Sequence, residues 1–182
     1  MRNGHAAKIG KNGYGGNISK FYSVTFSDTF LLTYTMKPKG ERSAARATIE
    51  KARDDYRNAP AIAVSGGRDF DDYDRLATEL DQLLQTHEAF RGKVVKFLVG
   101  TEEGAEQMAS QYADLHAITK VVFPANWRLH PHMGSYLRNE DMMVHATHLI
   151  AFWNGRSHSP QHLIKLAQER GIPTFIIRYE AK

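Results

Sequence analysis

The sequence of 182 residues contains no cysteine, and it contains no long apolar run. The first absence excludes a disulfide framework and any metal site with thiolate ligands. The second excludes a membrane-spanning helix, which needs about 18 or more mostly apolar residues. The N-terminal segment also lacks the hydrophobic stretch of a secretory signal. We therefore expect a cytoplasmic protein without a membrane partner.

Acidic side chains are scarce in the N-terminal third. Residues 1–58 carry 11 Lys and Arg against 5 Asp and Glu, whereas residues 59–182 carry 13 against 15. The basic balance of the chain thus belongs to its N-terminal part. This distribution argues against a broad positive face for nucleic acid on the rest of the chain. Nucleic-acid binding through the basic N-terminal segment is a third hypothesis, behind the two given below.

The pattern divides the chain into three parts: residues 1–16, residues 17–59 and residues 60–182. The first is a glycine-rich basic tail that we expect to be flexible. In the second, two alternating polar and apolar runs meet near Asp28 and predict a β-hairpin, and an amphipathic helix follows and ends before Asn58. The exposed edge and aromatic side chains of such a hairpin favour self-association, so we expect a homo-oligomer.

From Ala61 onward, short apolar runs alternate with amphipathic helical stretches. This alternation predicts an α/β fold with a mostly parallel five-stranded sheet, right-handed crossovers and helices on both faces. Strands are expected at residues 61–64, 93–99, 120–123, 148–153 and 174–178, and helices from Tyr73, around Ala105 to Tyr112, near 136–146 and around 161–170.

Glycine-rich or polar loops follow four of these strands. In a parallel sheet the carboxyl ends of the strands lie at one edge, where α/β proteins bind ligands. Helix N-termini, glycine turns and arginines suit a phosphate, and a tryptophan can stack on a base. The loops predict a site for a nucleotide-like ligand built from Ser65, Gly66, Gly67, Arg68, Gly100, Thr101, Gly104, Asn126, Trp127, Asn154, Gly155, Arg156 and Ser157, with Arg138 within reach.

Each of these features also has a plain structural explanation. A glycine pair occurs wherever a strand-to-helix turn is tight, and Trp153 closes an apolar run that favours a core position, so Trp127 is the better stacking candidate. Glu102 and Glu103 would repel a phosphate and are expected to face a ribose hydroxyl or solvent. His158 and His162 are spaced for a metal, but we expect His158 to precede its helix and no carboxylate completes the set, so no metal and no cofactor are predicted.

Several motifs follow one another over about residues 61–179: SGGRDF after the first strand of the main domain, FPANW, MGSYLRNEDMM, and IAFWNGRS with GIP near the end. Together they resemble the SLOG superfamily, in the branch related to YpsA. The resemblance implies a Rossmann-like, doubly wound domain that binds nucleotides or nucleotide-derived molecules, including ADP-ribose-type signals in some relatives. It also implies ligand contacts from Gly66, Gly67, Arg68, Arg138, Asn139 and residues 154–157.

The related LOG proteins are hydrolases that use a Gly-Gly-x-Gly-Thr-x-x-Glu loop and an arginine, which Arg138 resembles. Their loop is not intact here, because Ser159-Pro160 replaces Gly-Thr and Leu163 replaces the glutamate. Our first hypothesis is therefore a protein that senses or sequesters a nucleotide-derived small molecule, such as an ADP-ribose-like or cyclic nucleotide signal. The alternative is a hydrolase of such a molecule, with Asp69, Glu102 or Glu103 as the catalytic acid or base.

Overall fold

The computed structural model describes residues 21–26, 30–35 and 41–181, with side chains from residue 46 onward. The predicted flexible basic tail and the hairpin turn near Asp28 lie outside these residues. The chain divides into two compact units, residues 1–51 and residues 52–182, and each is described by itself. The division falls inside helix α1 (Glu41–Arg57), which the sequence pattern assigns wholly to the N-terminal appendage.

In the first unit, strand β1 (Phe21–Phe26) pairs antiparallel with strand β2 (Phe30–Thr35). Phe21 lies opposite Thr35 and Phe26 lies opposite Phe30, so the two strands are in register along their full length. The alternating runs predicted this hairpin, and helix α1 follows it as expected. Self-association through the hairpin stays a prediction, as does nucleic-acid binding by the basic segment.

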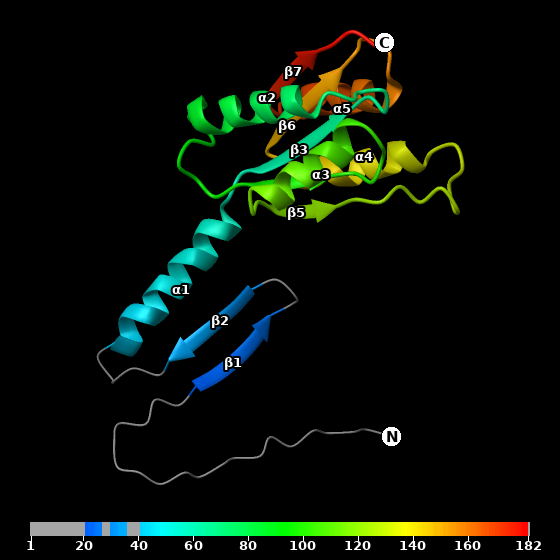
Figure 1. Ribbon diagram of the computed structural model, residues 1–182. Helices are drawn as coiled ribbons and strands as arrows, with labels where there is room; N and C mark the ends of the chain where they lie inside the picture. Colours follow the sequence, from blue (N-terminus) through cyan, green and yellow to red (C-terminus); the bar gives the residue numbers. More distant parts are fainter. Residues whose placement is uncertain (1–20, 27–29, 36–40, 182) are drawn as a thin grey trace, which may run out of the picture. The chain divides into compact units, whose positions relative to one another are not determined.

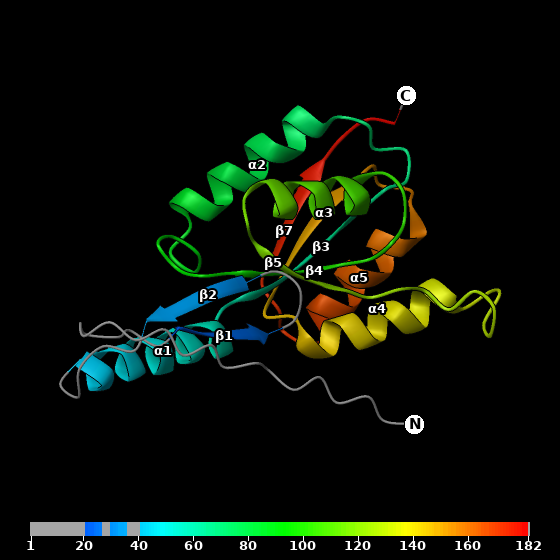
Figure 2. The same cartoon turned by 60° about the horizontal axis from the view of Figure 1, so that its bottom comes forward.

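The second unit is built on one parallel sheet of five strands, in the order β5-β4-β3-β6-β7. Figures 1 and 2 show the sheet at the centre of this unit. The chain first winds outward from β3 and then crosses back to the other side of it, which confirms the predicted Rossmann-like, doubly wound α/β fold. The strands are β3 (Ala61–Gly66), β4 (Lys96–Val99), β5 (Thr119–Val122), β6 (His148–Trp153) and β7 (Thr174–Arg178).

Two pairs of helices cover the two faces of this sheet (Figure 2). Helices α2 (Tyr73–Thr86) and α3 (Ala105–Leu115) lie on one face, and helices α4 (Gly134–His145) and α5 (His158–Glu169) lie on the other. Each face has its own hydrophobic core. Because successive strand residues point to opposite faces, Phe152 lies in the core beneath α2 and α3, and the adjacent Ala151 lies in the core beneath α4 and α5.

Several boundaries differ from the sequence prediction. β3 extends to Gly66 rather than ending at residue 64, and β5 covers Thr119–Val122 rather than residues 120–123. β4 begins at Lys96 rather than at residue 93, because the amide of Lys93 donates to the Phe90 carbonyl in a turn (2.9 Å) that uses the left-handed backbone of Gly92 (φ 70°). α4 begins at Gly134, slightly earlier than expected.

α5 begins at His158, so the prediction that His158 precedes its helix was wrong. The Oδ1 atom of Asn154 accepts from the backbone N–H groups of Arg156 (2.9 Å) and Ser157 (2.8 Å), and this turn starts the helix early. Pro160 then falls in the first turn of the helix, where a missing N–H costs nothing.

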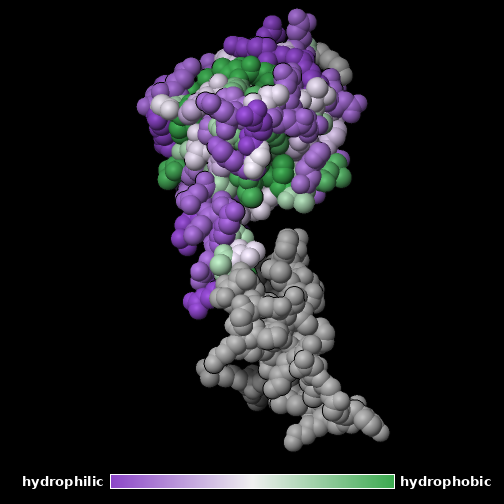
Figure 3. Space-filling model, turned by 90° about the vertical axis from the view of Figure 1, so that its left-hand side faces the viewer, coloured by the Kyte–Doolittle hydropathy of each residue, from purple (hydrophilic) through white to green (hydrophobic). Residues whose placement is uncertain are grey.

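The surface of the described residues is mixed in character. In Figure 3 polar side chains cover most of the coloured atoms, and hydrophobic ones form smaller patches between them. Among the described residues, no helix has both the length and the apolar character needed to cross a membrane.

Candidate functional site

The glycine pair at the end of β3 packs tightly against its neighbours. The amide of Gly67 donates to the Phe152 carbonyl on β6 (3.1 Å), and the Gly67 carbonyl accepts from Ala105 (3.3 Å). A Cβ added at Gly66 would overlap Ala105 and Phe152, and one at Gly67 would overlap Tyr179. Glycine is therefore required at Gly66, because α3 and β6 approach its backbone closely, whereas at Gly67 the crowding atom is the hydroxyl of Tyr179. The Gly67 amide is satisfied by β6.

A buried ion pair lies directly beneath the loop that follows β4. Nη1 of Arg138 is 2.8 Å from Oε2 of Glu106, and both side chains are 1% exposed. Glu106 also accepts from the Oγ of Ser65 (3.1 Å) and from the amide of Glu102 (3.4 Å). The pair joins α4 to α3, and two other nitrogens of Arg138, Nε and Nη2, have no partner among the described residues. A charge buried in this way needs its partner, because an isolated one costs several kcal/mol.

The sequence pattern placed Arg138 at this edge of the sheet but assigned no role to Glu106. Gly100 shows how closely the parts fit, because a Cβ added there would overlap both members of the ion pair. The available signal was the acid that follows Gly104 and Ala105 at the start of α3, a place where a carboxylate is favoured by the helix dipole.

An open hollow lies between the loops after β3 and β4. Its volume is about 620 Å³, and we call it the Trp127 hollow; it is lined by Arg68, Thr101, Glu102, Glu103 and Trp127. Arg68 forms an ion pair with Glu102, whose other oxygen accepts from Nε1 of Trp127 (3.3 Å). The two loops touch, because a Cβ added at Gly104 would overlap the backbone of Gly67 and Arg68.

The Trp127 ring is both accessible and held in place. Trp127 is 40% exposed, and its ring lies against Gly134 at the start of α4, where a Cβ would come within 2.9 Å of it. Asn126 supports the same loop, because its Oδ1 atom accepts from the amide of Leu129 (3.1 Å). The ring is thus positioned by its own loop and by α4 to act as a stacking surface.

The loops after β3 and β6 are joined to the end of β7. Asp69 accepts from the hydroxyl of Tyr179 (2.6 Å) and from Nδ2 of Asn154 (2.9 Å). The hydrogen bond from Tyr179 is the main cause that lowers the pKa of Asp69, burial opposes it, and Asn154 adds to it. Burial and the nearby Asp69 carboxylate raise the pKa of Tyr179. Asp69 is therefore ionised at neutral pH and unsuited to act as a general acid.

Residues 60–130 match the model of the YspA, cpYpsA-related SLOG family. The match begins at β3 and includes the loops that carry Arg68, Glu102 and Trp127, and it confirms the resemblance to the SLOG superfamily that the motifs indicated. The motifs around Arg138 and Asn154 lie beyond the matched residues and rest on resemblance alone. No curated protein and no solved structure matches the chain significantly.

The other predicted residues of the SLOG site lie outside the Trp127 hollow. Asn139 is buried and donates from Nδ2 to the Ser159 carbonyl (3.2 Å), so it points toward α5. Gly155 and Arg156 are exposed beside the turn that Asn154 closes. The structure therefore brings residues 65–68, residues 100–106 and Arg138 together. The loop after β6 meets them through the Asn154–Asp69 hydrogen bond and beside Gly67, where the Oγ atom of Ser157 would lie 3.1 Å from an added Cβ.

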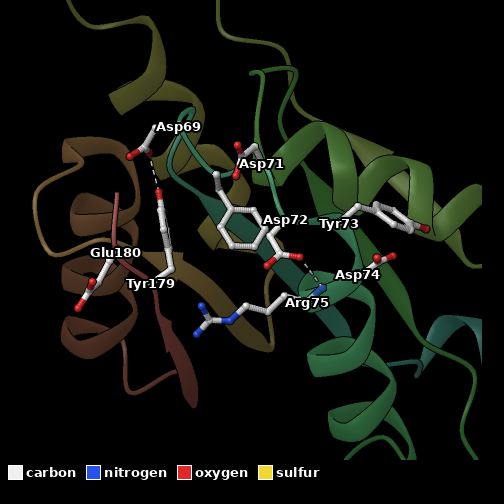
Figure 4. A pocket seen from close by; sticks show the side chains of 9 residues that line it. Asp69, Asp71, Asp72, Tyr73, Asp74, Arg75, Tyr179 and Glu180 are labelled. Carbon is white, nitrogen blue, oxygen red and sulfur yellow. Dashed lines mark hydrogen bonds between the residues drawn. The ribbon is translucent and has the colours of Figure 1, made fainter. Parts of the chain in front are cut away.

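A second hollow of this α/β unit is acidic. Figure 4 shows this pocket of about 380 Å³, lined by five carboxylates, Arg75, Tyr179 and two other aromatic residues. Asp72 accepts from the amide of Arg75 (3.0 Å) and so caps α2. Like charges at this density repel a phosphate, so this pocket is a poor site for a nucleotide. Across the described ranges, no group of three or more His, Asp or Glu side chains is arranged to hold a metal ion. The carboxylates are Asp69, Asp71, Asp72, Asp74 and Glu180.

Proposed function

We propose that the SLOG domain binds a nucleotide-derived small molecule in the Trp127 hollow. One observation carries the proposal: a single hollow at the carboxyl edge of the sheet combines an accessible tryptophan ring, an arginine, a hydroxyl and two carboxylates. These groups match the base, the phosphate and the ribose of a nucleotide. The family match over residues 60–130 supports the same ligand class.

Each side chain has a distinct role in this arrangement. The base stacks on Trp127, and the exposed Glu103 accepts hydrogen bonds from ribose hydroxyls. Arg68 takes the phosphate. Its present ion pair with Glu102 does not prevent this, because the Arg68 side chain is 63% exposed and such pairs contribute only about 0.2–1 kcal/mol. A phosphate, which makes stronger bidentate contacts to arginine, displaces the carboxylate.

The ligand classes we propose are an ADP-ribose-like molecule and a cyclic nucleotide, held for sensing or sequestration. They differ at the ribose. ADP-ribose offers free neighbouring hydroxyls to Glu103, whereas a 3′,5′-cyclic nucleotide has one of them closed in the ring. If Glu103 accepts hydrogen bonds from the ribose, Glu103→Ala weakens the binding of ADP-ribose more than the binding of the cyclic nucleotide. Titration calorimetry with the two ligands measures this difference.

The first experiment is mass spectrometry of small molecules released by heat from freshly purified protein, followed by calorimetry with the molecule found or with ADP-ribose. Trp127→Ala should weaken binding by about 1–3 kcal/mol, because it removes the stacking surface. Leu129→Ala is the matched control, since Leu129 lies in the same loop and is 69% exposed. Equal affinity of the two variants would contradict the proposed site.

Arg68 provides an independent test of the phosphate contact. Arg68→Gln should weaken binding about tenfold. A charge-assisted hydrogen bond contributes about 1.5–3 kcal/mol, and part of this is offset because Arg68 gives up its ion pair with Glu102 when the phosphate binds. The control is Arg128→Gln, which removes an equal charge from an exposed position next to Trp127. A loss of the same size in both variants would mean that only net charge matters.

Hydrolysis of the bound molecule is the alternative function. The exposed carboxylate of Glu103 beside the hollow favours it, whereas Glu102 is held by Arg68 and Trp127. The same preparations decide between the two. Intact ligand after long incubation with stoichiometric protein supports binding alone. Slow appearance of a cleaved product that Glu103→Gln abolishes would instead make the protein a hydrolase.

A further inference from the structure

A third hollow lies between α5 and the edge strand β7, and it shares no residue with the Trp127 hollow. Its volume is about 570 Å³, and we call it the Arg178 groove. The side chains that matter here are Tyr136, Trp153, His158, Lys165, Ile176 and Arg178. None of the lining residues is Asp or Glu, in contrast to the acidic pocket at the end of the same strand.

The guanidinium of Arg178 is held in place without a counter-ion. Its Cζ atom lies 4.2 Å from the centroid of the Trp153 ring, which is the neighbouring residue across the β6–β7 pairing. The ring is itself fixed, because Nε1 of Trp153 donates to the Ser157 carbonyl (3.0 Å). Over residues 46–181, no carboxylate lies within ion-pair distance of Arg178.

Stacking leaves the donors of Arg178 available. The ring contacts the face of the guanidinium, whereas its N–H groups lie in the guanidinium plane and point to the sides. Gly155 lies close by, since a Cβ added there would come within 3.3 Å of Nη1. A side chain at that position would crowd Arg178, so glycine keeps this flank of the guanidinium open.

The remaining charges of the groove are also positive or weakly compensated. Lys165 is 72% exposed and its Nζ atom lies 3.7 Å from Glu169, which is outside the lining. His162 lies 3.8 Å from Glu140, another acid outside the lining, and burial lowers the pKa of His162, so its ring is neutral at pH 7. The groove therefore presents Arg178 and Lys165 to any entering anion without facing carboxylates.

We propose that the Arg178 groove is a second binding site, for a phosphate-bearing small molecule with an apolar or aromatic part. The phosphate makes a bidentate contact with the guanidinium of Arg178, and Lys165 adds a second positive charge nearby. The apolar part lies along Ile176, which is 39% exposed, and Tyr136. The volume suits a ligand of small-molecule size. The proposal is independent of the function proposed for the Trp127 hollow.

The two tryptophans of the chain allow each hollow to be observed separately, because one lines each of them. In a Trp127→Phe protein, Trp153 is the only indole and reports on the groove. In a Trp153→Phe protein, Trp127 reports on the other hollow. Phenyl phosphate is the probe, since it carries one phosphate and one apolar ring, and inorganic phosphate is the comparison.

We expect a saturable change of Trp153 fluorescence with phenyl phosphate in the Trp127→Phe protein, and weaker binding of inorganic phosphate. By calorimetry, Arg178→Gln should lower the affinity about tenfold or more. Arg91→Gln should leave it unchanged, because it removes an exposed charge from the loop before β4, at the edge where the strands begin. Urea denaturation of both variants verifies that they are folded.

Three results would overturn the proposal. The first is an absence of saturable binding up to millimolar probe. The second is an equal loss in Arg178→Gln and Arg91→Gln, which would indicate attraction by net charge only. The third is a response of Trp127 in the Trp153→Phe protein without any response of Trp153, which would place the probe in the Trp127 hollow and would leave the function proposed there supported.

Discussion

Two arginines at the same edge of the sheet are held in opposite ways. Arg138 is buried and ion-paired with Glu106, on the side of the edge where β4 ends. Arg178 is exposed and stacked on Trp153 without a carboxylate partner among the described residues, on the side where β7 ends. The motif resemblance points to Arg138 as a ligand contact, yet the tertiary surroundings make Arg178 the more accessible cation.

The comparison shows that the partner of an arginine decides what it can do. Removing one member of a buried ion pair costs about 3–5 kcal/mol, so Arg138 is tied to the stability of the link between α3 and α4 at the edge of the sheet. An exposed cation–π contact contributes about 0.5–1 kcal/mol, so Arg178 can exchange partners with little loss. Ligand contact by Arg138 stays a prediction, and any such contact would have to reach Nε or Nη2, which are buried.

The largest expected effect comes from breaking the buried pair. Arg138→Met should lower the free energy of unfolding by about 3–5 kcal/mol, because Glu106 is left charged and buried. Urea denaturation followed by circular dichroism measures the loss. Adding Glu106→Gln in the same chain should recover part of it, since the amide is neutral and its oxygen can still accept from Ser65. A loss below about 1 kcal/mol in Arg138→Met would show that the pair does not hold α3 and α4 together.

Gly100 tests how tightly the same side is packed. Gly100→Ala should lower stability by about 1–3 kcal/mol, because its Cβ overlaps the Arg138–Glu106 pair. Gly92→Ala is the matched control, since Gly92 has φ 70° and no atom within 4 Å of an added Cβ, so only backbone strain of about 1–2 kcal/mol is expected there. If the affinity of the Trp127 hollow is unchanged in Gly100→Ala while stability falls, the ion pair supports the fold and not the ligand.

On the other side of the edge, Arg178→Ala should change stability by about 0.5–1 kcal/mol, in proportion to its single exposed contact. The fluorescence of Trp153 should change at the same time, because its nearest cation is removed. The two measurements need only denaturation and emission spectra. If Arg178→Ala lowered the free energy of unfolding as much as Arg138→Met, the two arginines would contribute equally to stability and the comparison would be wrong.

The smallest effect is a pH dependence at His162, which lies on α5 and lines the Arg178 groove. Burial is the main cause that lowers its pKa below 6.5 in the folded state. As pH falls below 6.5, the unfolded chain binds the proton first, so stability decreases with falling pH through that window and is full above it. His162→Gln should reduce the fall of the urea midpoint between pH 7.5 and pH 5.5, and the slope that remains includes His148, whose pKa burial also lowers. An unchanged slope in His162→Gln would contradict this assignment.

The periodic parts of the sequence predicted the fold well. The strands at residues 148–153 and 174–178 coincide with β6 and β7, because apolar runs bounded by glycine, proline and polar residues leave little freedom. The starts of β4 and α5 were missed, because the turn at Phe90–Lys93 and the turn that Asn154 closes before α5 are decided by local hydrogen bonds. Such bonds leave no periodic signal.

The sequence pattern also placed the right loops at one edge of the sheet, but it did not predict which of their side chains contact one another. Ser65, Gly100 and Arg138 were expected near one another, and they meet through Glu106, whose sequence signal was only its place in the first turn of α3. Arg178 was assigned only to the end of the last strand, and Tyr179 was given no role. Their roles depend on Asp69 and Trp153, which are distant in sequence and adjacent only after β3, β6 and β7 have assembled.

By itself, then, the sequence determined the parallel sheet, the two helical faces and the set of polar loops at the carboxyl edge, because period and glycine placement act over short stretches of chain. Only the tertiary structure decided which charges are cancelled and which stay open. Ion pairs and stacking join residues far apart in the chain, so the neutralised Arg138 and the uncompensated Arg178 become distinguishable only when the strands are side by side.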